Sequence, residues 1–279
     1  MAHVEQLISD ERAFLESLAA TVPTPEQLNH WRSETVAQRK TRLGKELYKQ
    51  MDGTVRYGAF KGQKLADNVW WSATDKASML CGFYEIEVLE TLRAVPAGRR
   101  RTFIDLGAAD GFYAIGMVRS GFAERAICFE MSEQGRQVIN HSAQANKVRD
   151  QIEIHGKAGA NFLQETQRID PSATTILIDV EGAEFDILTT KTLFDLRHCH
   201  IVMEVHNWID DFEQKYIQLL HEAANYFELG TITAGARDPG QIKELDALSD
   251  DNRWLICSEG RPNLMRWLTM QPLAPQAVK

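Results

Sequence analysis

The sequence predicts an α/β protein with a doubly wound, mostly parallel seven-stranded sheet and an N-terminal helical extension. Short apolar runs alternate with segments of helical periodicity from residue 102 onward, as in a parallel sheet covered by helices on both faces. A glycine-containing turn joins the first run to the next helix, which is typical of nucleotide-binding α/β units. The segment between the last two runs lacks a crossover-helix pattern, so we expect an antiparallel last strand.

The first 80 residues are expected to form helices and a hairpin outside the sheet. Residues 3–20 carry apolar residues near helical spacing, and Thr24–Gln27 has the capping-box pattern that begins a second helix. Residues 52–65 alternate apolar and polar side chains between glycines, which favours a hairpin. The two helices could form a lid, an arm that makes a homo-oligomer, or simple packing on the sheet.

Seven short apolar runs predict the strands of the sheet. They lie at residues 102–106, 126–130, 152–155, 175–180, 201–206, 227–233 and 254–258. Helices are expected before and between them, at residues 81–92, 132–146, near 161, 184–194 and 210–225. The run at 175–180 is the clearest buried strand, because it is almost continuously apolar. The segment from residue 264 to 279 is expected to be a C-terminal tail that ends disordered.

Composition and charge narrow the class of protein. A formal net charge of -8 argues against general affinity for nucleic acid, which depends on neutralising phosphates. The four cysteines are far apart, without the spacing of a zinc site or a disulfide framework. The N-terminus has no signal-peptide pattern, and no apolar run reaches membrane-spanning length. We therefore expect a cytoplasmic protein with no membrane span and no nucleic-acid partner.

The turn from Asp105 to Gly111 indicates which nucleotide the sheet binds. Gly107 and Gly111 allow unusual backbone angles and the close approach of a ligand. A dinucleotide fingerprint starting at Gly107 would need glycine at two positions where the chain has Ala109 and Phe112. Asp105 would also repel a pyrophosphate, whereas S-adenosylmethionine has no phosphate and carries an ammonium and a sulfonium. The turn therefore favours S-adenosylmethionine over a dinucleotide.

A second acid supports this choice of ligand. Glu130 ends the second apolar run, about 23 residues after Gly107, where a carboxylate can accept both hydroxyls of a ribose. The acid alone is a weak signal. Together with the glycine turn, this acid favours S-adenosylmethionine over a dinucleotide as the ligand.

Polar side chains gather where the expected strands end. Ligands of open parallel sheets bind outside these carboxyl ends. The residues are Asp105, Glu130, Asp179, Glu181, Glu204 and His206. Glu204 and His206 point the same way, because residues two apart in a strand share a face. Each also has a structural explanation: the acids could cap the following helices, and His206 could be a hydrogen-bonded histidine at the rim.

Four motifs in this order resemble the FkbM-type S-adenosylmethionine-dependent methyltransferases. They are Gly82-Phe83-Tyr84-Glu85, Phe103-Ile104-Asp105-Leu106-Gly107-Ala108-Ala109-Asp110-Gly111-Phe112-Tyr113, Ile178-Asp179-Val180-Glu181-Gly182-Ala183-Glu184 and Val202-Met203-Glu204-Val205-His206. The resemblance covers about residues 80–260 and implies the Rossmann-like class I methyltransferase fold and, usually, O-methylation. It divides the chain into an extension at 1–80, an S-adenosylmethionine-binding catalytic domain at 81–263 and the tail at 264–279.

The resemblance also implies a set of cofactor-binding residues. They are Tyr84, Glu85, Asp105, Gly107, Ala108, Ala109, Gly111, Phe112, Glu130, Met131, Lys157, Asp179 and Glu181. Many members of the family have Asn at the position of Ala109, so this chain lacks one polar group there.

Methylation of a hydroxyl needs a group that removes its proton, because a neutral hydroxyl is a poor nucleophile. His206 is the first candidate base, since its ordinary pKa lies near the operating pH. Asp179 is the second, and Glu204 completes the predicted catalytic group. In an alternative version, which we do not favour, Asp179, Glu204 and His206 hold a divalent metal that activates the hydroxyl.

These residues predict an O-methyltransferase acting on a saccharide or another small molecule. One alternative is a non-catalytic protein that keeps the fold and binds a partner. Another is a nucleic-acid methyltransferase, but base-methylating enzymes carry an Asn/Asp-Pro-Pro-Tyr/Phe string where this chain has Asp179-Val180-Glu181-Gly182. A nicotinamide dehydrogenase is more distant, because of Ala109 and Phe112.

Overall fold

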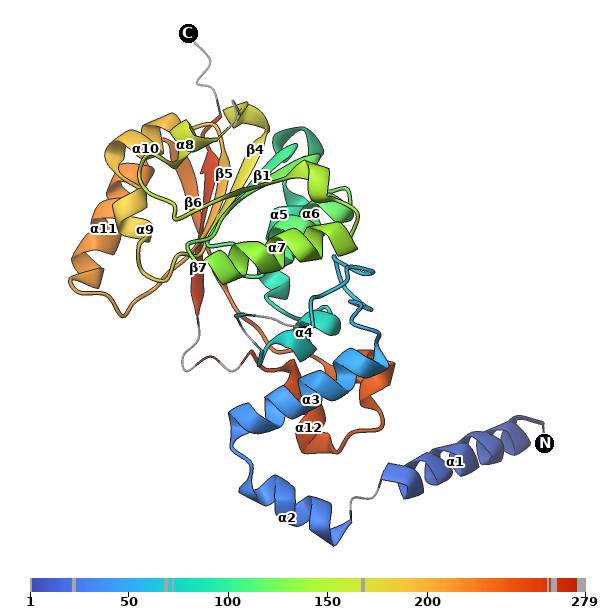
Figure 1. Cartoon of the computed structure of the whole chain (residues 1–279). Helices are drawn as coiled ribbons and strands as arrows, with labels where there is room; N and C mark the ends of the chain where they lie inside the picture. Colours follow the sequence, from blue (N-terminus) through green and yellow to red (C-terminus); the bar gives the residue numbers. More distant parts are fainter. Residues whose placement is uncertain are drawn as a thin grey trace.

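The computed structural model describes residues 2–21, 24–67, 70–71, 73–166, 169–259, 261 and 265–274. Figure 1 shows a central sheet with helices on both faces, while the N-terminal helix projects away from this body. The strands are β1 Thr102–Leu106, β2 Arg125–Phe129, β3 Ile152–His155, β4 Thr174–Ile178, β5 His200–Glu204, β6 Phe227–Thr233 and β7 Arg266–Pro272.

The sheet has the order β3-β2-β1-β4-β5-β7-β6. Its first five strands pair in parallel, and β7 runs antiparallel to both of its neighbours, β5 and β6. Asp105 of β1 lies between Cys128 of β2 and Leu177 of β4. The expected α/β class, with a doubly wound, mostly parallel seven-stranded sheet, is confirmed.

The α-helices account for most of the remaining described residues. They are α1 Ala2–Thr21, α2 Pro25–Ser33, α3 Val36–Gln50, α4 Lys76–Leu80, α5 Ile86–Ala94, α6 Phe112–Arg119, α7 Glu133–Ala145, α8 Phe162–Glu165, α9 Glu184–Ile187, α10 Thr190–Asp195, α11 Phe212–Ala223 and α12 Asp250–Cys257. Short 3-10 turns lie at Ala97–Arg99, Arg149–Gln151, Pro171–Ala173, Pro239–Gln241 and Lys243–Leu245. No helix among the described residues is long and apolar enough to cross a membrane.

Alternate residues of the strands fill two separate cores. Phe103 and Cys128 pack on one face of the sheet, and Ile104 and Ile127 pack on the other. This arrangement explains the continuous apolar runs, because every position of a strand covered on both faces is buried. All five residues of β1 and of β4 are buried.

Two predictions about the C-terminal part are wrong. Trp254–Cys257 of the expected strand instead belong to α12, which follows Ser249 and has two acids in its first turn. The described part of the expected tail instead supplies β7, whose Trp267, Leu268 and Met270 are buried, and the end of that tail lies outside the described residues. The run from Trp254 is too short to show a period, so its apolar character alone predicts a strand.

The N-terminal region differs from expectation in detail. The capping box of Thr24 and Gln27 begins α2 as expected, and a second capping box, at Thr35 and Gln38, begins a further helix, α3. Leu43 of α3 packs in a third core with residues of α4 and α12. In contrast, several apolar residues of α1 are exposed; they are Val4, Leu7, Ile8, Phe14 and Leu15.

Two further elements before the sheet are shorter than expected. The hairpin predicted over residues 52–65 is reduced, within the described part of this segment, to an isolated bridge between Thr54 and Lys64. The helix predicted over residues 81–92 begins only at Ile86. Gly82 cannot continue a helix there, because its φ is +71° and its backbone lies against the carbonyl of Tyr57.

Candidate functional site

A cavity of about 400 Å³ lies at the carboxyl ends of β1, β2 and β4. Most of the residues predicted for the cofactor line it. They are Tyr84, Asp105, Gly107, Ala108, Ala109, Phe112, Glu130, Met131, Lys157, Asp179 and Glu181. Glu85 and Gly111 are not among the lining residues. Of the three predicted catalytic residues, Asp179 lines the cavity, while Glu204 and His206 do not.

Gly107 sits where the backbone of β1 meets the backbone of β4. Its φ is +90°, and a Cβ atom at this position would lie 1.6 Å from the carbonyl oxygen of Asp179. The N–H of Asp179 donates to the carbonyl of Leu106 at 2.8 Å, which fixes the two strand ends together. The backbone N–H groups of Gly107 and Ala108 both donate to the carbonyl of Phe129 at 2.9 Å. The start of the turn is therefore held by both neighbouring strands.

Glu130 is oriented by the backbone around it. Its Oε2 accepts a hydrogen bond from the N–H of Ala109 at 2.9 Å, and its Oε1 accepts one from the N–H of Ser132 at 2.6 Å. Each carboxylate oxygen can accept a further hydrogen bond. The carboxylate that was predicted from the end of the second strand is thus fixed at the edge of the cavity.

Three residues of the predicted site other than glycine have a left-handed backbone. The φ angles are +45° at Glu85, +47° at Ala109 and +54° at Glu181. Such conformations cost roughly 1–2 kcal/mol for residues with a Cβ atom, and they concentrate at functional positions.

Asp105 is buried beneath the glycine turn. Only 2% of its surface is exposed, and its Oδ2 accepts no hydrogen bond from any described residue. Burial, together with the nearby charge of Asp179, raises the pKa of Asp105 to about 8. In the protein without a ligand, this carboxyl therefore keeps its proton at neutral pH.

His206 lies behind Asp179, at the centre of a group of carboxylates. The ring is 1% exposed, and its Nδ1 contacts Oε1 of Glu184. Its Nε2 lies 3.4 Å from Oδ1 of Asp179, 3.6 Å from Oε2 of Glu204 and 3.8 Å from Oε2 of Glu181. The structure therefore brings the three predicted catalytic residues together. Asp179 lines the cavity, whereas His206 and Glu204 are buried behind it.

The group is electrostatically coupled. Burial opposes a charge on His206, but the hydrogen bond to Glu184 and the nearby Asp179 and Glu181 carboxylates raise its pKa overall. Burial raises the pKa of Asp179 to about 6, against the opposing effect of His206. Burial and the charge of Asp179 also raise the pKa of Glu204. The charge of each residue in this group therefore affects the pKa of its neighbours.

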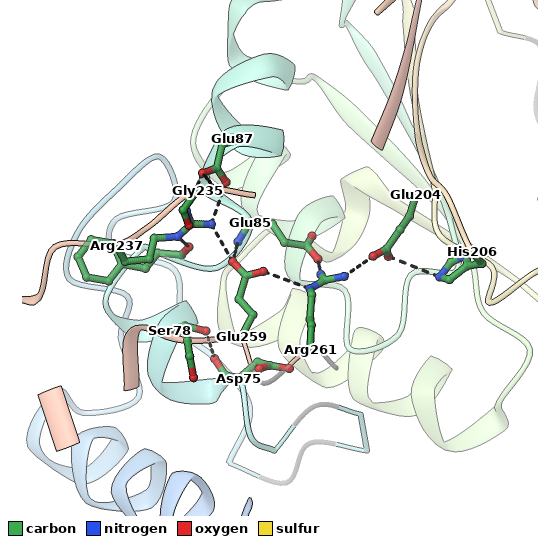
Figure 2. A network of polar contacts seen from close by, with 12 residues as sticks. Asp75, Ser78, Glu85, Glu87, Glu204, His206, Gly235, Arg237, Glu259 and Arg261 are labelled. Atoms are coloured by element: carbon green, nitrogen blue, oxygen red, sulfur yellow. Dashed lines mark hydrogen bonds and ion pairs between the residues drawn. The ribbon is translucent and has the colours of Figure 1, made fainter. Parts of the chain in front are cut away.

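Arg261, which the sequence analysis does not identify, connects this group of carboxylates to Glu85 at the start of α5. Figure 2 shows Arg261 between Glu85 and Glu204, with Nε donating to Oε2 of Glu259 at 3.1 Å. Glu259 in turn pairs with Arg237 at 2.8 Å. Arg261 lies beyond α12 and outside all the recognised motifs, so no local pattern in the sequence identified it.

Glu184 was also missed as a site residue. It belongs to the motif that begins at Asp179, but it was assigned only to the start of a helix. Its side chain is fully buried and contacts His206. The available signal was the position of this acid, a few residues after the end of a buried strand. A carboxylate buried there requires a partner, and His206 is one.

Comparison with known proteins adds to these observations. The model of the methyltransferase FkbM domain matches residues 65–231, which is more than half of the chain. No curated protein matches the chain.

Several solved structures resemble the chain at low identity. An O-methyltransferase from Bacillus cereus in complex with SAH is 10% identical, with 83% of this chain and 90% of that chain covered and a TM-score of 0.45. An rRNA methylase from Streptococcus thermophilus is 9% identical, with 68% and 96% covered and a TM-score of 0.46. A precorrin-6y C5,15-methyltransferase from Geobacter metallireducens is 12% identical, with 67% and 89% covered and a TM-score of 0.44.

The family match includes the glycine turn, the motif that begins at Asp179 and the strand that leads to His206. The matched range contains the central strands and all the residues that line the cavity. The chain belongs to the FkbM family of methyltransferases.

Proposed function

We propose that this protein is an S-adenosylmethionine-dependent O-methyltransferase whose acceptor is the hydroxyl of a saccharide or another small molecule. The observation that carries the proposal is the carboxylate of Glu130, fixed by two backbone N–H groups at the edge of the cavity. A ribose bound there would donate its two hydroxyls to the free positions of this carboxylate. The residues proposed for the cofactor are those of the predicted set that line the cavity.

The opposite part of the cavity suits the reacting end of the cofactor. Asp105 and Asp179 line it near Gly107, where no side chain separates the backbone from a ligand. Asp179 would favour the ammonium and sulfonium groups of S-adenosylmethionine, and their positive charge would in turn favour loss of the proton from Asp105. A pyrophosphate would be repelled by Asp179. The charge distribution therefore supports the cofactor inferred from the sequence.

The acceptor would occupy the remaining space beside aromatic side chains. Trp70, Trp71, Tyr84 and Phe112 line the cavity. The backbone N–H of Trp70 donates to Asp110 at 3.2 Å, which ties this aromatic segment to the glycine turn. Flat aromatic faces with a few polar groups are common in small-molecule sites. This lining supports a sugar or another small molecule as the acceptor.

Asp179 is the catalytic candidate with access to an acceptor, because it lines the cavity and His206 and Glu204 lie behind it. In the proposed reaction the acceptor oxygen attacks the methyl carbon in line with the sulfur. The new O–CH3 bond forms as the S–CH3 bond breaks, and the hydroxyl proton passes to Asp179. The products are the methyl ether and S-adenosylhomocysteine. His206 acts through Asp179, because its nearby charge favours the ionised form of that carboxyl, and Glu204 lies beside His206 in its pair with Arg261.

Calorimetric titration with S-adenosylhomocysteine tests the cofactor proposal. We expect the parent to bind and Glu130→Ala to bind about 30-fold more weakly or worse, since charged hydrogen bonds contribute about 1.5–3 kcal/mol each. Glu133→Ala is the matched control. Glu133 is an acid three residues after Glu130, at the start of α7, and it does not line the cavity. A folded parent that does not bind would contradict the proposal and favour the partner-binding alternative.

Methyl transfer then needs its own assay. S-adenosylmethionine carrying a labelled methyl group would be incubated with a panel of saccharides, small alcohols and, for comparison, transfer and ribosomal RNA. We expect label in a hydroxyl-bearing small molecule and its loss in Asp179→Asn. Label found in RNA alone would refute the proposed acceptor class while leaving the cofactor intact.

A further inference from the structure

One ring nitrogen of the site faces three carboxylate oxygens at distances longer than an ordinary hydrogen bond. His206 is 1% exposed, and Glu184 occupies its Nδ1. Its Nε2 faces oxygens of Asp179, Glu204 and Glu181 at 3.4, 3.6 and 3.8 Å. Typical N–H···O hydrogen bonds are about 2.7–3.2 Å long. A buried ring nitrogen is therefore directed at several oxygens without a normal bond to any of them.

These separations suit ligands that share one ion. Nitrogen and carboxylate ligands lie about 2.0–2.2 Å from a bound transition metal, so two ligands of one ion are at most about 4.4 Å apart. The distances from Nε2 to Asp179 and Glu181 are below that limit. The ligand atoms of the three residues all lie within 4.8 Å of one another, so the two carboxylates need to approach each other by at most about 0.4 Å to share an ion. The Oδ1 atom of Asp179 is buried and accepts no hydrogen bond within the described part of the chain.

Glu184 gives the histidine the orientation that a ligand needs. Metal-binding histidines usually donate their second ring N–H to a carboxylate, which fixes the tautomer and leaves the other nitrogen free to bind. Glu184 is 0% exposed, and its Oε1 contacts Nδ1 of His206. This contact is independent of the acids in front of Nε2, and with the proton on Nδ1 it would leave the lone pair of Nε2 facing them.

We propose that Asp179, Glu181 and His206 bind one divalent transition-metal cation, such as Mn²⁺, at the edge of the cavity. The set differs from the one considered from the sequence, because Glu181 replaces Glu204. Glu204 is instead paired with Arg261. One imidazole and two carboxylates favour a transition metal over Mg²⁺ or Ca²⁺, which prefer oxygen ligands.

The inference rests on the proposed function for its chemical role. Asp179 and Glu181 both line the cavity, so a cation between them would face the acceptor. It would stabilise the oxygen anion that forms as the hydroxyl loses its proton. One oxygen of Asp179 is enough to hold the cation, and the other can still accept that proton. Cation and carboxylate would then act on the same hydroxyl.

Titration of the full chain with Mn²⁺, followed by the electron paramagnetic resonance signal of the free ion, tests the site. We expect one Mn²⁺ per chain with a Kd below about 100 μM, which is about tenfold tighter than a weak, millimolar association. Glu181→Gln and His206→Gln should each weaken binding by about tenfold or more. Glu181 has a half-exposed side chain, so its amide variant provides a test that does not depend on core packing.

Glu153→Gln is the matched control. It removes a carboxylate from another histidine–glutamate pair, in which Oε1 of Glu153 lies 2.5 Å from Nε2 of His155. Binding equal to that of the parent is expected. The inference is overturned if the parent leaves Mn²⁺ free, or if Glu181→Gln and His206→Gln both bind it as the parent does.

The two proposals fail in different ways. A parent that binds S-adenosylhomocysteine but not Mn²⁺ contradicts the metal site alone. A parent that binds Mn²⁺ but not S-adenosylhomocysteine contradicts the proposed function and leaves the metal site standing. Because the manganese signal needs neither cofactor nor acceptor, the two results are independent.

Discussion

Replacing Gly107 by alanine tests the account of how the site is held at the edge of the sheet. The left-handed backbone at φ +90° costs a residue with a Cβ roughly 1–2 kcal/mol. The new Cβ would also lie 1.6 Å from the carbonyl oxygen of Asp179, so the ends of β1 and β4 must separate. Overpacking of this kind costs about 1–3 kcal/mol. The sum, about 2–5 kcal/mol, is a large part of the roughly 5–15 kcal/mol of a typical domain.

Two other glycines allow the steric part of this cost to be measured. Gly121 has a φ of +71°, and an added Cβ would meet nothing within 4 Å, so Gly121→Ala carries only the backbone cost. Gly98 also has free space and no left-handed backbone, so Gly98→Ala should change stability by less than about 1 kcal/mol. Urea unfolding of the three variants should give the order Gly98→Ala, Gly121→Ala, Gly107→Ala from most to least stable. A Gly107→Ala protein as stable as Gly121→Ala would refute the reasoning.

Two further variants test the buried charges. Burial raises the pKa of Asp105 to about 8, so this group stabilises the folded state most at low pH, and its contribution is lost as the pH rises toward 8. Asp105→Asn should therefore flatten the fall in free energy of unfolding between pH 5 and 8, and an unchanged slope in urea titrations would contradict the assignment. Arg237→Met should cost about 3 kcal/mol, because it leaves the partly buried Glu87 and Glu259 without their shared cation. Thermal unfolding measures this cost, and a change below about 1 kcal/mol would argue against the network.

The central sheet was predictable because its strands obey a local rule. Strands buried on both faces must be apolar at every position, and β1 and β4 show this directly in the sequence. The position of the last strand could not be predicted by this rule, because α12 and β7 are both short segments that contain apolar residues. The signals that separate them, Ser249 followed by Asp250 and Asp251, mark the start of a helix. The apolar residues that follow these acids favour a strand, so the two signals predict different structures for the same segment.

The site was predictable to the extent that strand ends determine it. Asp105, Glu130 and Asp179 follow from the rule that ligands bind at carboxyl ends, and the structure places all three at the cavity. The depth of His206 behind Asp179 depends on how neighbouring strands stagger, which the sequence does not record. Arg261 was unpredictable for a similar reason, because its partner Glu85 is 176 residues away along the chain.

The place of β7 in the sheet has a consequence for biosynthesis. This strand lies between β5 and β6 and hydrogen-bonds to both, although it is the last of the seven to leave the ribosome. Until then, β5 and β6 have no strand between them, and the facing edges carry unpaired N–H and C=O groups. Such edges are sites of mispairing between chains. The nascent protein thus passes through a stage in which all the residues that line the cavity have been made while the sheet still has a gap. The gap closes once Arg266–Pro272 has emerged and paired with both strands.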